Sequence, residues 1–301
     1  MTTYRYLHYD VFTDRALVGN QLAVFPEPAG LSAGDMLAVT REMNFSECTF
    51  IFPPETPGTH VRMRIFTPGE ELPMAGHPTI GSTFALVKEG VIAPNQRDFV
   101  FGLGVGPTPV SIDWKDGTID FAWMTQKTPA HLGAIGDRSA FARAIGLSEA
   151  DLSDAPPEVV SSGNKFLITP LRSRDAVDRV EINRAPYVAC CTAAGLNEMP
   201  LFIFTTAGAT GSEDVYARML GPGLGVSEDP ATGSAVGPLG GYLHAHRLLA
   251  RERLSHLIVL QGVKMLRPSR LHVSVETTGD AIAQVRVGGH SVLVGDGRLT
   301  F

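Results

Sequence analysis

Three side chains that can move protons lie beside stretches of small residues. Glu47 lies in NFSECTF, His77 in MAGHPTIG and Asp229 in EDPATGSAVG. A carboxylate and an imidazole in a partly desolvated pocket can be tuned toward neutral pH, where they act as general acid and base. These residues therefore indicate proton-transfer chemistry.

The small residues around His77 and after Asp229 are typical of helix beginnings left open to a ligand. A helix N-terminus carries unpaired N–H groups and a partial positive charge. Small side chains let a carboxylate or an enolate approach those groups closely. The segments AGHPT (75–79) and ATGSA (231–235) therefore suit an anionic substrate.

Each of these residues also has a purely structural interpretation. Glu47 could be a solvated turn residue, and His77 could cap its helix or satisfy a backbone group. Asp229 could serve only as an N-cap, which is the common role of an aspartate before a helix. Capping by Ser234 and close helix packing by the glycines at 237, 240 and 241 are further alternatives. Single residues leave these alternatives open.

An internal repeat favours the functional interpretation. VRMRIFTPG (61–69) and VYARMLGPG (215–223) share Val, Arg, Pro and Gly at equal spacing, 154 positions apart. The same offset places AGHPTIGST (75–83) opposite DPATGSAVG (229–237). We therefore expect two halves of similar fold, each with a strand, a loop and a helix N-terminus that help to form one cleft.

Composition excludes several classes of protein. The 301 residues are 44% hydrophobic and 19% charged, which suits a large core, and a net charge of −6 argues against nucleic-acid binding. We see no apolar run of membrane-spanning length and no signal-peptide pattern at the N-terminus. Three cysteines, two of them adjacent, make no disulfide framework, so we expect a cytoplasmic protein without membrane contact.

Cofactor and metal motifs are missing as well. GLGVG and GPGLG have the wrong spacing for a dinucleotide fingerprint, and Walker A, H-E-x-x-H and C-x-x-C patterns do not occur. His244 and His246 are two positions apart, which points them to different faces of a helix and makes them poor joint metal ligands. We expect no cofactor and no metal.

The pattern of elements is mixed α/β, with many strands and few helices. Helical spacing is expected over 31–44, where Ser32 and Asp35 form a capping-box-like start, over 77–90 and over 137–146. Alternating apolar segments between them indicate strands. We place the domain boundary in the Pro- and Gly-containing stretch near 125–137, which gives an N-terminal domain of 1–128 and a C-terminal domain of 129–301.

Over nearly its whole length the sequence resembles the PhzF family of phenazine-biosynthesis isomerase-like proteins. The resemblance rests on GNQLAVF, REMNFSECTFI, RIFTPGEELPMAGHPTIG, EDPATGSAVGPLGGYL and LQGVKMLRPS, in this order. It implies a diaminopimelate epimerase-like α+β fold of two pseudo-symmetric domains, each a rolled mixed sheet around a central helix, with the active site between them. It also implies that the last strand, about 285–301, crosses back to the first domain, and that the protein is a homodimer.

The resemblance further implies roles for the residues above. Glu47 matches the family's catalytic glutamate, which would take a proton from a ring carbon and return it further along the conjugated system. His77 and Asp229 would polarise the substrate or pass protons. The substrate-binding residues would be Asn20, Gly76, Gly233 and Ser234. The family's usual GNP reads GNQ at 19–21, which removes a proline that fixes φ.

The absence of cysteine from the two helix-start segments separates two enzyme classes. Epimerases of this fold use one thiol from each half, whereas MAGHPTIG and EDPATGSA contain none. We therefore expect a cofactor-independent isomerase of a small cyclic or unsaturated amino or hydroxy carboxylate, similar to trans-2,3-dihydro-3-hydroxyanthranilate isomerase. The alternatives are a racemase or epimerase that works with Glu47 and a second acid such as Asp229, and a non-catalytic metabolite-binding module.

Overall fold

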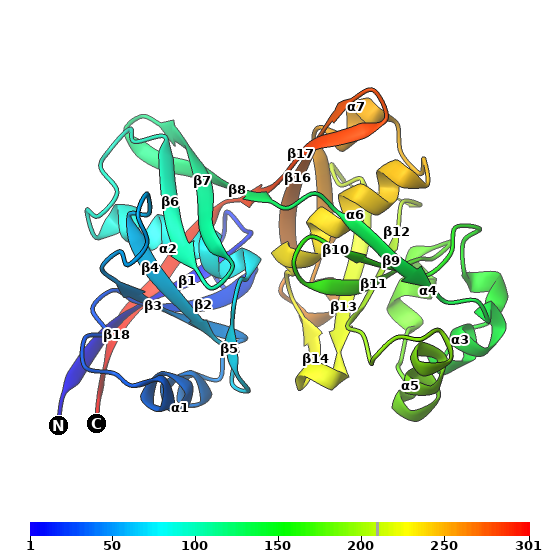
Figure 1. Cartoon of the computed structure of the whole chain (residues 1–301), viewed down its shortest axis with the longest axis horizontal. Coiled ribbons are helices and arrows are strands. Elements are labelled where there is room, and N and C mark those ends of the chain that lie inside the picture. Colours follow the sequence, from blue (N-terminus) through cyan, green and yellow to red (C-terminus); the bar gives the residue numbers. More distant parts are fainter. Residues whose placement is uncertain (209–210) are drawn as a thin grey trace. The chain divides into compact units, whose positions relative to one another are not determined.

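A computed structural model describes residues 1–208 and 211–301 (Figure 1). The chain forms two compact units: unit 1 comprises residues 1–125 and 287–301, and unit 2 comprises residues 126–286. The chain passes from unit 1 to unit 2 at the end of β8 (Thr118–Gln126) and returns within β17 (Ala281–Gly289). Within the described residues, no helix has the length and apolar character needed to cross a membrane.

Unit 1 is a mixed sheet with two helices. The pairing order is β18–β1–β2–β3–β4–β6–β7, continued by β8, with the short β5 on β4. The pairs β2/β3 and β4/β6 are parallel, and the others are antiparallel. Besides β8, the elements of unit 1 are β1 (Thr3–Val11), β2 (Asn20–Phe25), α1 (Ala33–Met43), β3 (Glu47–Phe52), β4 (Val61–Phe66), β5 (Glu71–Leu72), α2 (Gly76–Lys88), β6 (Asp98–Leu103), β7 (Gly106–Lys115) and β18 (Ser291–Thr300).

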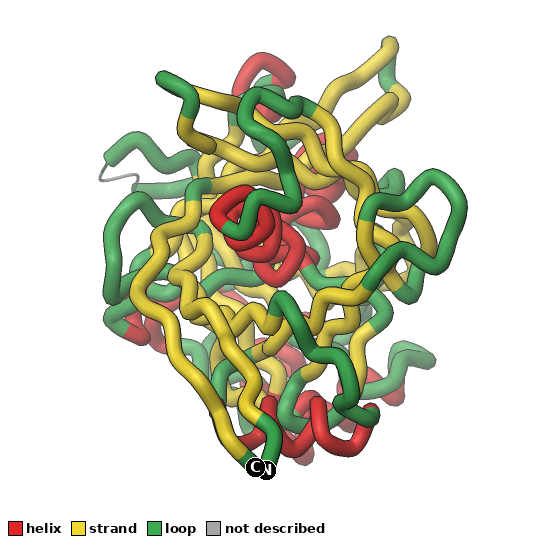
Figure 2. The backbone as a smooth tube through the Cα atoms, turned by 90° about the vertical axis from the view of Figure 1, so that its left-hand side faces the viewer, coloured by secondary structure: helices red, strands yellow, loops and turns green. Residues whose placement is uncertain are grey.

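Helix α2 is the centre of unit 1. Every residue from Gly76 to Leu86 is buried, so the helix has no solvated face in its first three turns. It contacts β1, β2, β3 and β18, and Figure 2, which views the molecule from the side of unit 1, shows strands around the helix near the centre. A hydroxyl contact of 2.9 Å between Thr49 and Ser82 joins β3 to α2. The sheet therefore rolls around this helix.

Helix α1 covers the other face of β3. It begins after Ser32, whose hydroxyl accepts from the Asp35 N–H while the Asp35 carboxylate accepts from the Ser32 N–H. This confirms the capping box expected from the sequence. Cys48 and Phe50 pack with Met36 of α1 in one apolar cluster. Since strand side chains alternate, Glu47 lies on the α2 face together with Thr49.

Unit 2 is also a mixed sheet with a buried helix. Helix α6 is buried over Gly233–Leu243 and contacts β10, β11 and β16. Besides β17, its elements are β9 (Ala130–Ala134), α3 (Arg138–Ala144), η1 (Glu149–Asp151), β10 (Glu158–Ser161), β11 (Lys165–Pro170), α4 (Arg174–Arg179), α5 (Arg184–Ala193), β12 (Leu201–Thr205), β13 (Val215–Gly221), η2 (Pro222–Leu224), β14 (Val226–Asp229), α6 (Gly233–Ala245), α7 (Arg251–Leu254), β15 (Leu257–Gln261), η3 (Val263–Met265) and β16 (Ser269–Thr278).

The two units pair their strands in the same order. In unit 1, β2 is parallel to β3, β3 antiparallel to β4, and β4 parallel to β6. In unit 2, β11 is parallel to β12, β12 antiparallel to β13, and β13 parallel to β15. A buried helix of 13 residues precedes β6 in one unit and β15 in the other. The repeat expected from the sequence is therefore a repeat of topology.

The arginine shared by the two repeats has the same contact in both. Arg64 on β4 makes a bidentate pair with Glu71 on β5, with distances of 2.7 and 2.6 Å. Arg218 on β13 makes a bidentate pair with Glu228 on β14, with distances of 3.0 and 2.9 Å. Each guanidinium therefore holds the short strand that leads to the central helix.

The helix beginnings depart from the expected alignment. The strand repeats are 154 positions apart, whereas α2 begins at Gly76 and α6 at Gly233, which are 157 positions apart. Unit 2 has three more residues between the strand and the helix. The equivalent of Gly76 is therefore Gly233, and the alignment of Gly76 with Pro230 was wrong.

Candidate functional site

Glu47 is the first residue of β3, where the parallel register places it opposite Leu22 of β2. Its side chain is 15% exposed. The strand holds the carboxylate on the α2 face, at the end of the strand where the chain enters from a turn. The position agrees with the expectation of a residue that ends a turn before an apolar strand, and its burial argues against a freely solvated turn residue.

His77 lies beside Glu47 and is the second residue of α2. The imidazole Nε2 is 3.4 Å from Glu47 Oε2, and the His77 side chain is only 4% exposed. On the other side of the ring, Nδ1 is 3.2 Å from Asn20 Nδ2. Unit 1 thus brings together three of the residues singled out in the sequence: Asn20, Glu47 and His77.

Asn20 lies between Ser46 and His77 and contacts both side chains. The Ser46 hydroxyl donates to Asn20 Oδ1 at 3.3 Å, which leaves the Asn20 amide N–H groups for the ring. The Asn20 amide can therefore donate to Nδ1 of a neutral His77 ring.

Burial sets the charge of His77. Desolvation lowers the pKa of this imidazole to about 3, and a backbone hydrogen bond with Gln21 offsets the effect only partly. His77 is therefore neutral near pH 7. Its 3.4 Å contact with Glu47 joins a neutral ring to a carboxyl group, so it is not an ion pair.

A glycine with a left-handed backbone sets the start of β2. Gly19 has a φ of +76°, and a Cβ atom there would lie 2.5 Å from the Val11 carbonyl oxygen. Asn20 follows as the first residue of β2 and pairs with Val11 across the ladder. Glycine is the residue type that accepts this conformation without strain. Gly19 thus fixes the position of Asn20 at the start of β2.

The N-terminus of α2 has no side-chain cap among the described residues. The N-cap residue is Ala75, in extended geometry with a φ of −150° and a ψ of 151°. Gly76 and His77 are the first two helical residues, and Pro78 has no N–H group. The N–H groups of the first turn and their partial positive charge therefore form a site that suits an anion.

Asp229 in unit 2 is a buried acid with fixed partners. It is the last residue of β14 and is 7% exposed. The Thr232 hydroxyl donates to Asp229 Oδ2 at 2.6 Å. The Gln261 amide donates to the Asp229 carbonyl at 2.7 Å and lies 3.0 Å from the Thr232 hydroxyl. Asp229 thus belongs to a connected network.

The structure excludes the alternative that Asp229 is only the N-cap of α6. The N-cap residue of α6 is Thr232, and the helix begins at Gly233, followed by Ser234. The Thr232 hydroxyl does not cap the helix, because it is directed to Asp229. Like α2, α6 has no side-chain cap in the described part of the chain, so its first turn also suits an anion.

Sequence reasoning missed Thr232 and Gln261. Thr232 lies inside EDPATGSAVG and Gln261 inside LQGVKMLRPS, both motifs of the family resemblance. The backbone N–H of Thr232 donates to Gln261 Oε1 at 3.1 Å, which ties the two motifs together. The sequence signal for Gln261 is its polar side chain at the end of an otherwise apolar strand, LIVLQ.

The glycines further along α6 serve packing, as the structural alternative proposed. A Cβ atom on Gly241 would lie 2.5 Å from Pro129 Cβ, and one on Gly240 would lie 2.7 Å from Val275 Cγ2. These positions allow neighbouring side chains to approach the central helix closely. They need no role in substrate binding.

None of the three cysteines lies within the first turn of α2 or of α6. Cys48 packs on the α1 face of β3, and its burial raises the pKa of its thiol to about 12. Cys190 and Cys191 lie on α5, and all three are free thiols. A thiol with such a high pKa is a poor base at neutral pH. That no pair of thiols serves these helix N-termini stays a prediction.

Comparison with known proteins shows the family. The family model described as phenazine biosynthesis-like protein matches residues 9–297. A trans-2,3-dihydro-3-hydroxyanthranilate isomerase from Pseudomonas aeruginosa is 34% identical over 298 residues, which cover 98% of this chain and 99% of the relative.

Two solved structures have the same fold over nearly the whole chain. A PhzF family phenazine biosynthesis protein from Bacillus anthracis matches with a TM-score of 0.87, 25% identity and full coverage of both chains. A protein from Pseudomonas aeruginosa described as a predicted epimerase matches with a TM-score of 0.82, 34% identity and 99% coverage of both chains. The chain therefore belongs to the PhzF family of phenazine biosynthesis-like proteins.

Proposed function

We propose that this PhzF-type isomerase moves a proton along a small unsaturated amino or hydroxy carboxylate, with Glu47 as the group that carries it. The observation that supports this most strongly is the contact of 3.4 Å between Glu47 and His77 in a largely buried site. A carboxylate that takes a proton from one carbon can return it to another carbon of the same conjugated system, so the step needs no net reagent.

His77 would act as a hydrogen-bond donor. Because burial lowers its pKa to about 3, the ring does not carry a positive charge at neutral pH. A neutral imidazole with its proton on Nε2 can stabilise the Glu47 carboxylate or a developing negative charge on the substrate. We therefore assign to His77 the positioning and polarising role, and to Glu47 the transfer of the proton.

The substrate carboxylate would bind at a helix N-terminus. The first turns of α2, with Gly76, and of α6, with Gly233 and Ser234, offer backbone N–H groups without a side-chain cap. Asp229 is held by Thr232 and suits contacts with an amino or hydroxyl group of the substrate. Asn20 would act through His77, whose ring it orients.

Solvent hydrogen exchange tests this proposal. Trans-2,3-dihydro-3-hydroxyanthranilate, the substrate named for the Pseudomonas aeruginosa relative, would be incubated in heavy water with the wild type, Glu47→Gln and Glu42→Gln. Wild type should incorporate deuterium at carbon and form the isomer. Glu47→Gln should lose about 10²-fold or more in rate, which is the usual contribution of general acid–base catalysis.

Glu42→Gln is the matched control because Glu42 is exposed on α1. Its rate should equal that of the wild type. Equal rates for wild type and Glu47→Gln would remove Glu47 from the proposed role. A wild type that neither isomerises this compound nor exchanges its hydrogens would overturn the substrate class.

Racemisation or epimerisation is the second candidate, because Asp229 is a second buried acid and a relative of known structure is described as a predicted epimerase. Polarimetry on amino and hydroxy acids separates the two activities. Inversion that depends on both Glu47 and Asp229 would favour this candidate over the isomerase.

A further inference from the structure

Two histidines and one glutamate of unit 2 converge at a place that none of the proposed chemistry uses. His131 Nδ1 lies 3.0 Å from Glu158 Oε1, and His246 Nε2 lies 2.8 Å from Glu158 Oε2. The three donor atoms all lie within 4.8 Å of one another. Each oxygen of the carboxylate therefore faces a different imidazole.

Three elements bring these residues together. His131 on β9 pairs with Val160 of β10, two residues from Glu158, and a register shift separates Val159 from Val160. Residues two apart on a strand share a face, so His131 and Glu158 are diagonal neighbours across the ladder. His246 is the C-cap residue of α6.

Tyr242 packs against His246 at the C-terminal end of α6. The Tyr242 ring lies 4.3 Å from the His246 ring between centroids. The Tyr242 hydroxyl donates to the Pro156 carbonyl at 2.7 Å, which ties this helix turn to the chain before β10. The C-terminal end of a helix also carries partial negative charge, which favours a cation nearby.

We propose that His131, Glu158 and His246 form a binding site for a divalent transition metal, with Zn²⁺ as the best fit. Two imidazole nitrogens and one carboxylate oxygen are a ligand set that suits Zn²⁺. Ligands with bonds of about 2.1 Å in tetrahedral geometry lie about 3.4 Å apart. The three donor atoms here lie within 4.8 Å of one another, so side-chain adjustments of up to about 1.4 Å bring them to that spacing.

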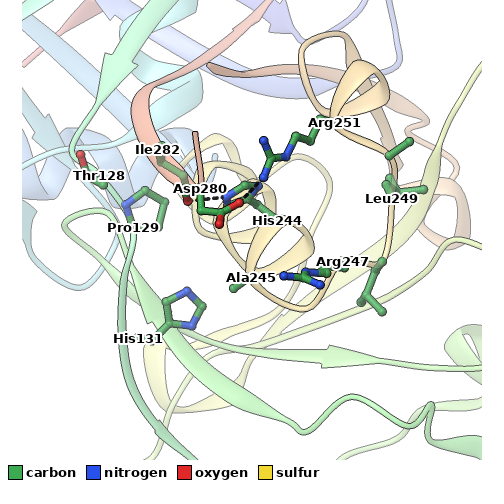
Figure 3. A pocket seen from close by; sticks show the side chains of 13 residues that line it. Thr128, Pro129, His131, His244, Ala245, Arg247, Leu249, Arg251, Asp280 and Ile282 are labelled. Carbon is green, nitrogen blue, oxygen red and sulfur yellow. Dashed lines mark hydrogen bonds and ion pairs between the residues drawn. The ribbon is translucent and has the colours of Figure 1, made fainter. Parts of the chain in front are cut away.

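The site would have an open coordination position. The side chains of His131, His246 and Glu158 are 33%, 25% and 15% exposed, so solvent reaches the cluster. His131 also lines a cavity of about 750 Å³, whose lining includes Pro129, His244 and Arg251 (Figure 3). Two guanidiniums line this cavity: Arg251 is paired with Asp280, which reduces its repulsion of a metal ion, and Arg247 is exposed to solvent, which screens its charge. Water can thus complete the ligand shell.

The proposed site differs from the pair considered in the sequence. His244 and His246 are two positions apart, and the His244 Nε2 is directed at the Asp280 carbonyl at 2.9 Å. The partners of His246 in the cluster are His131 and Glu158, which lie 115 and 88 positions earlier in the chain. Spacing along the sequence could not reveal this set.

Titration calorimetry of the full chain with ZnCl₂, after treatment with a chelator, tests the site. We expect one Zn²⁺ per chain with micromolar or tighter affinity, and a loss of about 10²-fold or more in His246→Ala and Glu158→Gln. His256→Ala is the matched control, because His256 is an exposed histidine of the same unit outside the cluster. Its affinity should equal that of the wild type.

Two further readouts do not depend on the variants folding. Co²⁺ in place of Zn²⁺ should give the visible absorption band of a tetrahedral site, and crystals soaked in Zn²⁺ should show an anomalous peak between these three side chains. Wild-type binding weaker than about 0.1 mM, or an anomalous peak elsewhere only, would overturn the proposal and leave a hydrogen-bonded network.

Discussion

The neutral state of His77 has a consequence for stability in acid. The unfolded chain binds a proton on this histidine near its ordinary pKa of about 6.5, whereas the folded protein holds the pKa at about 3. Because the unfolded state binds more protons in this window, stability falls as the pH falls from about 6.5 toward 3, by up to about 1.4 kcal/mol per pH unit from this group.

Urea unfolding at pH 7 and pH 4.5 measures the effect. His77→Gln should show a smaller loss in the free energy of unfolding between the two pH values than the wild type, by roughly 2–3 kcal/mol. His256→Gln, which removes an exposed histidine, should behave like the wild type. An equal loss in wild type and His77→Gln would mean that His77 is not buried in its neutral form.

At the scale of residues, the sequence identifies the candidate site residues but does not reveal their charge states. Glu47, His77 and Asp229 stand out because acids and imidazoles beside small residues are uncommon without a reason. The charge of His77 depends on burial within unit 1 and, in the opposite direction, on a backbone hydrogen bond with the distant Gln21, so the local sequence around His77 contains no signal for it. Their catalytic roles stay a proposal.

At the level of elements, the two shared arginines differ in burial. The Arg218 side chain is 6% exposed and Glu228 is 14% exposed, whereas Arg64 and Glu71 are 18% and 40% exposed. Arg218 also donates to the Val177 carbonyl at 2.8 Å. Removing one partner of a buried pair leaves an uncompensated charge, while an exposed pair contributes little.

We therefore expect Arg218→Met to lower the free energy of unfolding by about 3 kcal/mol or more, and Arg64→Met by about 1 kcal/mol or less. Chemical denaturation of the two variants gives both values, and each variant serves as the control for the other. Equal losses would show that burial does not distinguish the two pairs.

Elements with strong local signals could be predicted, and those set by distant partners could not. The Ser32–Asp35 capping box identified the start of α1 because both partners lie in one turn. The repeat offset of 154 aligned Gly76 with Pro230 instead of Gly233, because the connection after β13 is three residues longer than its counterpart in unit 1. Thr232 became the N-cap through contacts with Asp229 and Gln261, and Gln261 lies 29 positions away.

At the scale of the whole molecule, unit 2 is continuous in sequence and unit 1 is not. Strand β18 pairs with β1 along its entire length, from Thr3 opposite Thr300 to Val11 opposite Ser291. Without residues 287–301, β1 loses one neighbour and α2 loses a strand that it contacts. We predict that a fragment of 126–286 folds alone and that a fragment of 1–125 does not.

Circular dichroism and NMR spectra of the two fragments test this prediction. A third fragment, in which a flexible linker joins 287–301 to residue 125, should regain the folded state of unit 1, since β8 and β17 pair. The result that contradicts the prediction is a folded 1–125 fragment, because it would show that β18 is dispensable.

The pairing of β1 with β18 also determines the order in which the units can form during synthesis on the ribosome. Domains generally fold in the order in which they are translated. Here unit 1 becomes complete only after unit 2 has been translated, because β18 follows unit 2 along the chain. Unit 2 can therefore be complete while β1 still lacks β18. The first residues to be synthesised are then among the last to gain their strand partner. A chaperone that protects an exposed strand edge would be of most use to this segment during that interval.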